Sequence, residues 1–244
     1  MSTQAPARPR VAMLVIGDEI LTGKVQDENS PWIARRCRSL GLHLCRIIVL
    51  PDDMDEIAAA VAEWSIRCDF VFTSGGVGPT HDDLTMAAVA RGLARPIERN
   101  PELLTVIEDR MGKRFTPAAA RMADIPAGAV LWWDGELRFP QVVVGNVVIF
   151  PGVPSLLQLK FDAIAHRFGG TPVVSERLVT TLGESSIADG LRAIQARFPK
   201  VAIGSYPQYT ERPWTVTITM DAADARAIAP CRAAISDLIG DHVP

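Results

Sequence analysis

The sequence FVFTSGGVGPTHDD occupies residues 70–83. The apolar run at residues 69–73 predicts a buried strand, and residues 82–93 predict a helix. Between them, residues 74–80 hold three glycines and a proline, which is more than a plain turn requires. Glycine amides can converge on phosphate oxygens, and a helix start adds a positive dipole end. The stretch therefore predicts a strand, a phosphate-binding loop and a helix, with a tight structural turn as the alternative.

The residues before this loop show the same alternation of strand and helix. Apolar runs at residues 11–16 and 43–50 predict two more buried strands. A helix between them stops at Gly41, and Asp53 with Glu56 has the spacing of a capping box that opens a helix to about residue 67. This order implies an α/β fold, with a mostly parallel sheet covered by helices on both faces.

The second half of the chain is organised differently. Two short apolar runs flank Gly145 and Asn146, a pair typical of a hairpin turn, and a helix follows at residues 154–168. From Gly169 onward the pattern predicts a small β-α-β-β-α unit. We therefore divide the chain into a flexible tail at residues 1–10, an α/β domain at residues 11–168 and a small α/β subdomain at residues 169–244.

Composition limits the classes of function. Hydrophobic residues make up 48% of the chain and charged residues 22%, as in folded globular proteins. The net charge of −3 gives no broad positive field, so we expect no nucleic-acid partner. No run approaches the roughly 20 apolar residues that span a bilayer, so we expect no membrane association. Four cysteines without a Cys-x-x-Cys pair favour a reduced, cytoplasmic protein.

Acidic residues follow three of the predicted strands. Asp18 and Glu19 follow the first strand, Asp52 follows the second, and Asp82 and Asp83 end the glycine loop. Because parallel strands end at the same edge of a sheet, these carboxylates should converge near the loop. Such a site could hold Mg²⁺ or another divalent cation, which substrate phosphates readily share. Helix capping and metal binding are both open for Asp82, whereas we favour a functional role for Asp83.

Two further features could belong to the same site. Pro151 and Gly152 join a strand to a helix and could form another wall of the pocket, or only a turn. Asn29 precedes a helix, so a capping role and a role in the site are equally open.

Together these residues resemble the molybdopterin-binding domain family. The most similar branch is the CinA-like one, which includes the N-terminal domain of competence/damage-inducible protein A and of animal FAD synthase. The matching stretches are residues 17–21 with Gly23, residues 27–29, residues 49–53, residues 75–83 with Thr85, and residues 151–154. Their order and spacing agree over about residues 10 to 165. The small C-terminal unit also looks like the one that follows this domain in CinA.

The resemblance implies a three-layer α/β/α fold, a homo-oligomer and a pocket for molybdopterin or an adenine dinucleotide. Residues matching Asp52 and Asp83 are associated with activity in the molybdopterin adenylyltransferases, so we expect these two residues to be catalytic. Asp52, Asp82 and Asp83 are the expected metal ligands. The residues expected to bind phosphate or substrate are Gly17, Asp18, Glu19, Ser74, Gly75, Gly76, Gly78, Pro79, Thr80, Pro151 and Gly152.

Three functions are consistent with this resemblance. The first is a divalent-metal-dependent pyrophosphohydrolase acting on ADP-ribose or FAD, in which the amides of Gly75, Gly76 and Gly78 hold the developing charge. The second is a molybdopterin adenylyltransferase, although residues 17–19 and 78–80 look more like the CinA type. The third is a module that binds a pterin or nucleotide without turnover. Residues 134–140 lack the glycine-rich sequence that CinA relatives often carry, which keeps the third function open.

Overall fold

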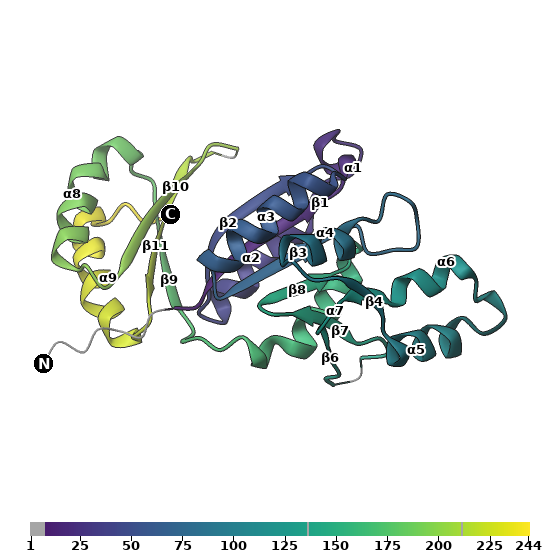
Figure 1. Ribbon diagram of the computed structural model, residues 1–244. Helices are drawn as coiled ribbons and strands as arrows, with labels where there is room; N and C mark the ends of the chain where they lie inside the picture. Colours follow the sequence, from purple (N-terminus) through teal and green to yellow (C-terminus); the bar gives the residue numbers. More distant parts are fainter. Residues whose placement is uncertain (1–7, 136, 211) are drawn as a thin grey trace, which may run out of the picture. The chain divides into compact units, whose positions relative to one another are not determined.

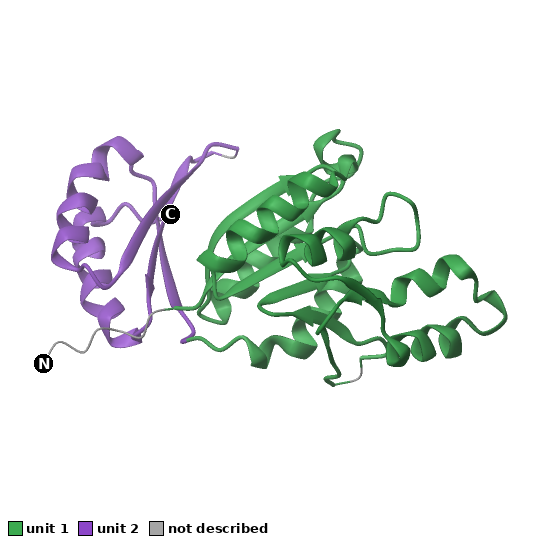
Figure 2. Cartoon of the chain, viewed as in Figure 1, with its two compact units in different colours: residues 1–170 green, residues 171–244 purple. Residues whose placement is uncertain are grey.

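The computed structural model describes residues 8–135, 137–210 and 212–244. It separates into two compact units, unit 1 at Met1–Gly170 and unit 2 at Thr171–Pro244 (Figure 2). Residues 1–7 of the predicted tail and residue 136 of the 134–140 segment lie outside the described residues. The end of the predicted tail belongs to unit 1, because the Arg8 guanidinium donates to the carbonyls of Gly41 and Leu42 and the first strand begins at Arg10.

Unit 1 is built on one six-stranded sheet with the order β2-β1-β3-β8-β7-β6. Its strands are β1 (Arg10–Ile16), β2 (His43–Leu50), β3 (Phe70–Ser74), β6 (Val130–Trp132), β7 (Gln141–Val144) and β8 (Val147–Phe150). The first four strands in this order are parallel to one another, and β7 is antiparallel to both of its neighbours, β8 and β6. The predicted, mostly parallel sheet is confirmed.

Helices cover both faces of this sheet (Figure 1). The covering helices are α2 (Asn29–Ser39), α3 (Met54–Arg67), α4 (Thr85–Gly92), α5 (Pro101–Met111) and α7 (Pro154–Ile164). Alternate residues of β1 face opposite sides, so that Met13 packs in one core with Phe161 of α7, whereas Leu14 packs in the other with Val61 of α3. Two separate cores on one sheet make the predicted three-layer α/β/α fold.

One predicted helix start is capped as expected, and another is not. Asp53 caps α3 as predicted, since its Oδ1 atom accepts from the amides of Asp55 and Glu56 at 2.9 Å. By contrast, α4 begins at Thr85, three residues after the predicted start, and no side chain caps it. The capping interpretation of Asp82 is therefore wrong, and residues 75–84 form a longer irregular loop than expected.

Several short elements carry no clear periodicity in the sequence. Helix α1 (Asp18–Leu21) replaces part of a predicted loop, and β4 (Ile97–Arg99) pairs with β5 (Asp124–Pro126) in a separate two-stranded sheet. The remaining short helices are η1 (Gly112–Arg114), α6 (Pro117–Ala120), η2 (Arg121–Ala123) and η3 (Ala165–Arg167). Among them, β4, η2 and β5 matter for the candidate site described below.

Unit 2 has the predicted β-α-β-β-α order. Its elements are β9 (Val174–Thr180), α8 (Glu184–Arg197), β10 (Ala202–Gln208), β11 (Thr215–Ala222) and α9 (Ala225–Ile239). The sheet is antiparallel with the order β10-β11-β9, and α8 and α9 pack on the buried, alternate residues of β11 (Figure 1). In the described parts of both units, no helix has the length and apolar character needed to cross a membrane.

Candidate functional site

Four strands of unit 1 end side by side at one edge of the sheet. Ile16 of β1 lies opposite Leu50 of β2, and Ser74 of β3 lies opposite Phe150 of β8. The segments that follow these strands are also joined: the Gly17 amide donates to the Leu50 carbonyl at 3.1 Å. The structure thus brings the predicted residues after four strands to one edge.

Gly75 makes the closest approach at this edge. Its φ of 108° suits glycine, and a Cβ atom here would collide with the carbonyl oxygen of Ile16. Gly152 also lies against it, since a Cβ on Gly152 would be 3.2 Å from the Gly75 Cα. The Gly75 amide donates to the Phe150 carbonyl at 3.3 Å, so this amide is already paired within the protein.

Gly76 turns the chain away from the sheet with a φ of 61°. A Cβ atom at this position would come within 2.5 Å of the Thr85 hydroxyl oxygen. Thr85 is completely buried; its amide donates to the Gly76 carbonyl at 3.0 Å and its hydroxyl to the Gly75 carbonyl at 2.7 Å. The first residue of α4 therefore fixes the start of the glycine loop.

A hollow of about 170 Å³ lies along this loop. Residues 76–80 and Asp83 form one side, and residues of α4, β4, η2 and β5 form the other. The amides of Gly76, Val77 and Gly78 have no hydrogen-bond acceptor among the described residues. Three neighbouring donors beside a hollow are suited to bind an anion, because each would otherwise need water as its partner.

Asp83 holds the far end of the loop. Its Oδ2 atom accepts from the Thr80 amide at 2.8 Å and also from the Thr80 hydroxyl. The same atom lies 2.6 Å from where a Cβ on Gly78 would stand, so the carboxylate packs directly on the loop backbone. Asp82, by contrast, is exposed.

Asp52, Asp18 and Glu19 lie at the sheet edge rather than in the hollow. Asp52 Oδ2 accepts from the Asp18 amide at 3.0 Å, which fixes the start of α1. The Glu19 carboxylate folds over Gly17, at 2.5 Å from the position of a Cβ there. Pro79 and Thr80 line the hollow with Gly76 and Gly78, whereas Pro151 follows β8 at the edge.

Asn29 is a site residue that the sequence left undecided. It begins α2 but does not cap it, because the Ser30 amide donates to Asp27 Oδ1 at 3.0 Å instead. The Asn29 side-chain nitrogen donates to the Ser74 hydroxyl at 2.9 Å and to the Gly152 carbonyl at 2.7 Å. Asn29 therefore clamps the ends of β3 and β8 together.

Unpaired buried polar atoms gather near the same edge. Among the described residues they are Asn29 Oδ1, Ser30 Oγ, Thr73 Oγ1 and Gln141 Oε1. Asn29 and Ser30 begin α2, Thr73 is the last but one residue of β3, and Gln141 begins β7 next to the end of β8. Buried polar atoms nearly always have partners, so such a group points to a bound water or ligand.

Metal binding by protein side chains alone is not supported by this arrangement. In the described parts of the chain, no group of three or more His, Cys, Asp or Glu side chains is placed to hold an ion. Asp52 and Asp83 bond to different segments, and each uses one carboxylate oxygen for that bond. Mg²⁺ usually takes one or two carboxylates together with phosphate oxygens. Any cation bound here would therefore need the phosphate oxygens of a ligand to complete its coordination.

Arg121 is a candidate binding residue that no sequence pattern indicated. It begins η2, lines the hollow and donates from Nη2 to the Pro79 carbonyl at 3.1 Å. The guanidinium group is thus bonded to the loop at Pro79 and adds a positive charge to the lining of the hollow. Arg121 begins a three-residue helix, which is too short to show a periodic sequence pattern. The sequence alone therefore did not identify it.

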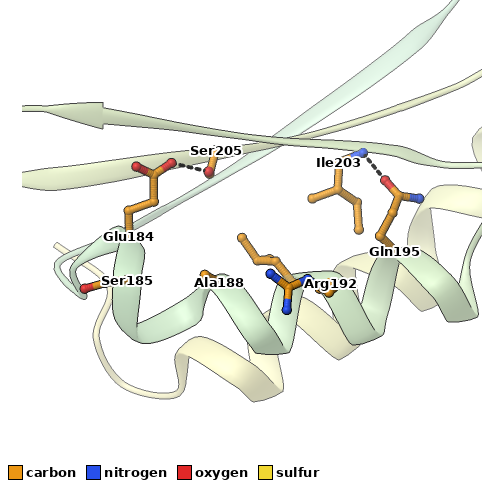
Figure 3. A pocket seen from close by; sticks show the side chains of 8 residues that line it. Glu184, Ser185, Ala188, Arg192, Gln195, Ile203 and Ser205 are labelled. Atoms are coloured by element: carbon orange, nitrogen blue, oxygen red, sulfur yellow. Dashed lines mark hydrogen bonds between the residues drawn. The ribbon is translucent and has the colours of Figure 1, made fainter.

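A second hollow, of about 570 Å³, lies between α8 and β10 in unit 2 (Figure 3). Its polar side chains are bonded within the unit. The Ser205 hydroxyl donates to Glu184, Gln195 Oε1 accepts from the Ile203 amide at 2.9 Å, and Arg192 pairs with Asp189 at 2.8 Å. The bonds of Ser205 and Gln195 hold α8 on β10, whereas the Arg192–Asp189 pair lies within α8. We assign no ligand to this hollow.

Both units resemble known protein families. Residues 12–170 match the family described as a probable molybdopterin binding domain, and residues 172–243 match the middle domain of FAD synthase. The probable FAD synthase of Caenorhabditis elegans is 30% identical over 271 residues, covering 98% of this chain and 51% of that protein. A CinA-like protein of Anaeromyxobacter dehalogenans (strain 2CP-1) is 41% identical over 152 residues, covering 59% of this chain and 37% of that protein.

A solved structure supports the same relationship. The crystal structure of the protein CinA from Thermoplasma acidophilum, described as of unknown function, superposes with a TM-score of 0.61. It is 28% identical, and the match covers 66% of this chain and 98% of that one. Our chain spans about half the length of the FAD synthase relative that it matches.

Proposed function

Because this chain belongs to the molybdopterin-binding domain family, in its CinA-like branch, we propose that unit 1 binds and cleaves the diphosphate of ADP-ribose or FAD with a divalent cation. The observation that carries this proposal is the loop at residues 76–78, whose residues line a hollow together with Arg121 and whose three amides have no acceptor among the described residues. The relatives named CinA-like protein and FAD synthase support a phosphate-bearing, nucleotide-like or pterin-like ligand.

The loop amides are the proposed phosphate contacts. Gly76, Val77 and Gly78 have N–H donors without an acceptor among the described residues, and Arg121 adds a guanidinium group bonded to the Pro79 carbonyl of the same loop. Donors that are fixed before the ligand binds stabilise charge that develops on phosphate oxygens, because they need not reorient during the reaction. This set replaces the one expected from the sequence, since the Gly75 amide is paired with Phe150.

The sheet edge is the proposed contact for the rest of the ligand. Asn29 Oδ1 and the hydroxyl groups of Ser30 and Thr73 are buried without partners among the described residues. Ribose hydroxyls and pterin or adenine N–H groups are the kinds of group that pair with such atoms. Without such a contact, each of these atoms stays buried and unpaired, which costs about 1–3 kcal/mol.

Asp83 and Asp52 are the proposed cation ligands, with Asp82 as a further one. A divalent cation held by these carboxylates would supply polarisation of the diphosphate and a lower pKa for an attacking water. Asp83 has a second role, because its bonds to Thr80 keep the loop closed over the hollow. Asp52 likewise holds the start of α1 through the Asp18 amide.

Cleavage assays test this proposal. ADP-ribose and FAD are each incubated with the full chain and Mg²⁺, Mn²⁺ or Co²⁺, and release of AMP is measured by chromatography. We expect turnover with at least one pairing, and the Asp83→Asn variant should fold but lose turnover. Asp109→Asn on α5, an exposed carboxylate away from the loop, is the matched control and should keep it. Absence of AMP with every pairing would count against hydrolysis.

A binding module without turnover is the second candidate. This candidate is favoured because the described residues contain no group of three carboxylates that could hold a metal ion. This candidate predicts heat of binding in calorimetry without any product. Adenylyl transfer to molybdopterin is the remaining alternative, and formation of an adenylated pterin from molybdopterin and ATP would identify it.

A further inference from the structure

Three arginines gather at the opposite edge of the unit 1 sheet. Arg10 begins β1 and lies opposite His43, which begins β2; Arg46 follows in β2, and Arg67 ends α3. Because β1 and β2 are parallel, their amino ends lie at the edge away from the glycine loop. A hollow of about 500 Å³ is lined there by Arg10, His43, Cys45, Arg46, Trp64 and Arg67.

Trp64 holds two of these guanidinium groups in place. The Cζ atoms of Arg46 and Arg67 lie 5.9 Å and 5.5 Å from the centroid of its ring, and Trp64 itself is only 8% exposed. Cation–π contact fixes each guanidinium on the same indole. Two like charges held on one ring repel each other, and an anion between them would offset that repulsion.

The protein supplies too few carboxylates to neutralise this cluster. Arg67 pairs with Glu63 at 2.7 Å, whereas Asp69 accepts from the backbone amide of Arg10. No carboxylate among the described residues forms an ion pair with the side chains of Arg10 or Arg46. The excess of positive charge is local, because the whole chain carries a net charge of −3.

We propose that this hollow is a second anion site, distinct from the glycine loop, that binds a diphosphate group. Guanidinium forks bind phosphate oxygens in pairs, and Arg46 and Arg67 are already oriented by the indole. The volume falls within the range of about 300–1,000 Å³ found for small-molecule sites. Inorganic pyrophosphate and the diphosphate of a nucleotide share this chemistry. The site does not depend on the function proposed for the loop.

Nuclear magnetic resonance of the full chain tests the site. The indole N–H signal of Trp64 is assigned with a Trp64→Phe variant and followed while pyrophosphate, or ADP in a parallel series, is added. We expect the signal to move with both anions. Tighter binding of ADP would show that the hollow also takes the nucleoside, and equal affinities would show that it binds the diphosphate alone.

Substitutions separate this site from the loop. The double variant Arg10→Gln with Arg46→Gln should weaken the Trp64 response by about tenfold or more, because it removes two charged hydrogen-bond donors. Arg110→Gln with Arg192→Gln, two exposed arginines elsewhere, should leave it unchanged. Gly76→Ala should also leave it unchanged, even if the loop no longer binds a ligand.

Three results would overturn the site. The first is a Trp64 indole N–H signal that does not shift with either anion. The second is an unchanged shift of this signal in the Arg10 and Arg46 double variant, and the third is loss of the shift in Gly76→Ala. If the double variant does not fold, Arg46→Lys keeps the charge but removes the fork and should still weaken binding measurably. An unaltered affinity in Arg46→Lys would then contradict the proposal.

Discussion

The side-chain nitrogen of Asn29 lies 2.7 Å from the carbonyl oxygen of Gly152, a residue 123 positions away in the sequence. The same nitrogen bonds the Ser74 hydroxyl, so one amide group joins the start of α2 to the ends of β3 and β8. Its oxygen atom is buried without a partner among the described residues. Asn29 therefore holds the edge of the sheet together, and its unpaired oxygen is the acceptor that we propose for a ligand.

Replacing Asn29 with Ala should affect both stability and ligand binding. We expect a loss of about 1–3 kcal/mol in the free energy of unfolding, measured with urea, because one buried and one partly buried acceptor lose their donor. The thermal stabilisation by ADP-ribose or FAD should also fall. Asn146→Ala is the matched control, since Asn146 donates to the carbonyls of Ser65 and Cys68 in a similar clamp. An unchanged ligand effect in Asn29→Ala would contradict the assignment.

Replacing Gly76 with Ala should disturb the loop more than strain alone explains. Gly76 and Gly145 have nearly the same φ, 61° and 58°, so Ala costs about 1–2 kcal/mol in backbone strain at either position. A Cβ at Gly145 meets no atom within 4 Å, whereas one at Gly76 strikes Thr85. Calorimetry should show weaker ADP-ribose binding for Gly76→Ala only. Equal affinities in the two variants would refute a role for the loop.

Replacing Arg121 with Ala should weaken binding of a phosphate-bearing ligand by about tenfold, because a charged donor beside the loop is lost. Arg95 donates to the Ala127 carbonyl at 2.9 Å without lining the hollow, so Arg95→Ala is the control. Isothermal titration with ADP-ribose and FAD measures both variants. If Arg121→Ala bound as tightly as Arg95→Ala, the guanidinium would have only a structural role.

Lys160 should make stability depend on pH in an unusual range. Burial lowers the pKa of its amine from 10.5 to about 8, while its ammonium donates to the carbonyls of Phe139 and Pro140. Between about pH 8 and 10.5 the unfolded chain binds more protons, so this residue adds stability as pH rises, up to about 3 kcal/mol. Below pH 8 the penalty for burying the charge is fully present.

The Lys160→Met variant isolates this contribution. The difference in unfolding free energy between the native chain and the variant should grow in favour of the native chain as pH rises from 8 to 10.5. Urea unfolding at several pH values measures it, and subtraction removes the effect of other groups that titrate in this range. Parallel curves for the two proteins would show that Lys160 is not perturbed in the folded chain.

The fold was largely predictable because its signals are local. Apolar runs marked β1, β2 and β3, and the Asp53 capping box marked α3, since each depends on residues close in sequence. The predicted start of α4 was wrong. Thr85 donates to the carbonyls of Gly75 and Gly76, and these bonds replace the local side-chain cap that the sequence suggested. Short elements such as α1 and η2 are too brief to show a period.

The sequence predicted where the site lies in the fold, but it did not predict which atoms in the site are bonded to each other. Parallel strands had to place Asp18, Asp52 and the glycine loop at one edge, and the register shows that they do. No local pattern could show that the Gly75 amide would pair with Phe150, or that Arg121 would reach Pro79 across 42 residues. Such contacts depend on how distant segments pack.

In the proposed site, a ligand diphosphate binds the amides at residues 76–78. The most direct test follows the backbone amide signals of Gly76 and Gly78 by nuclear magnetic resonance while ADP-ribose is added, with and without Mg²⁺. Phosphate contact should shift both signals strongly and saturably, and slow their exchange with solvent. If both signals stayed in place while signals elsewhere in unit 1 moved to saturation, the ligand would bind away from the loop, which would contradict the proposed site.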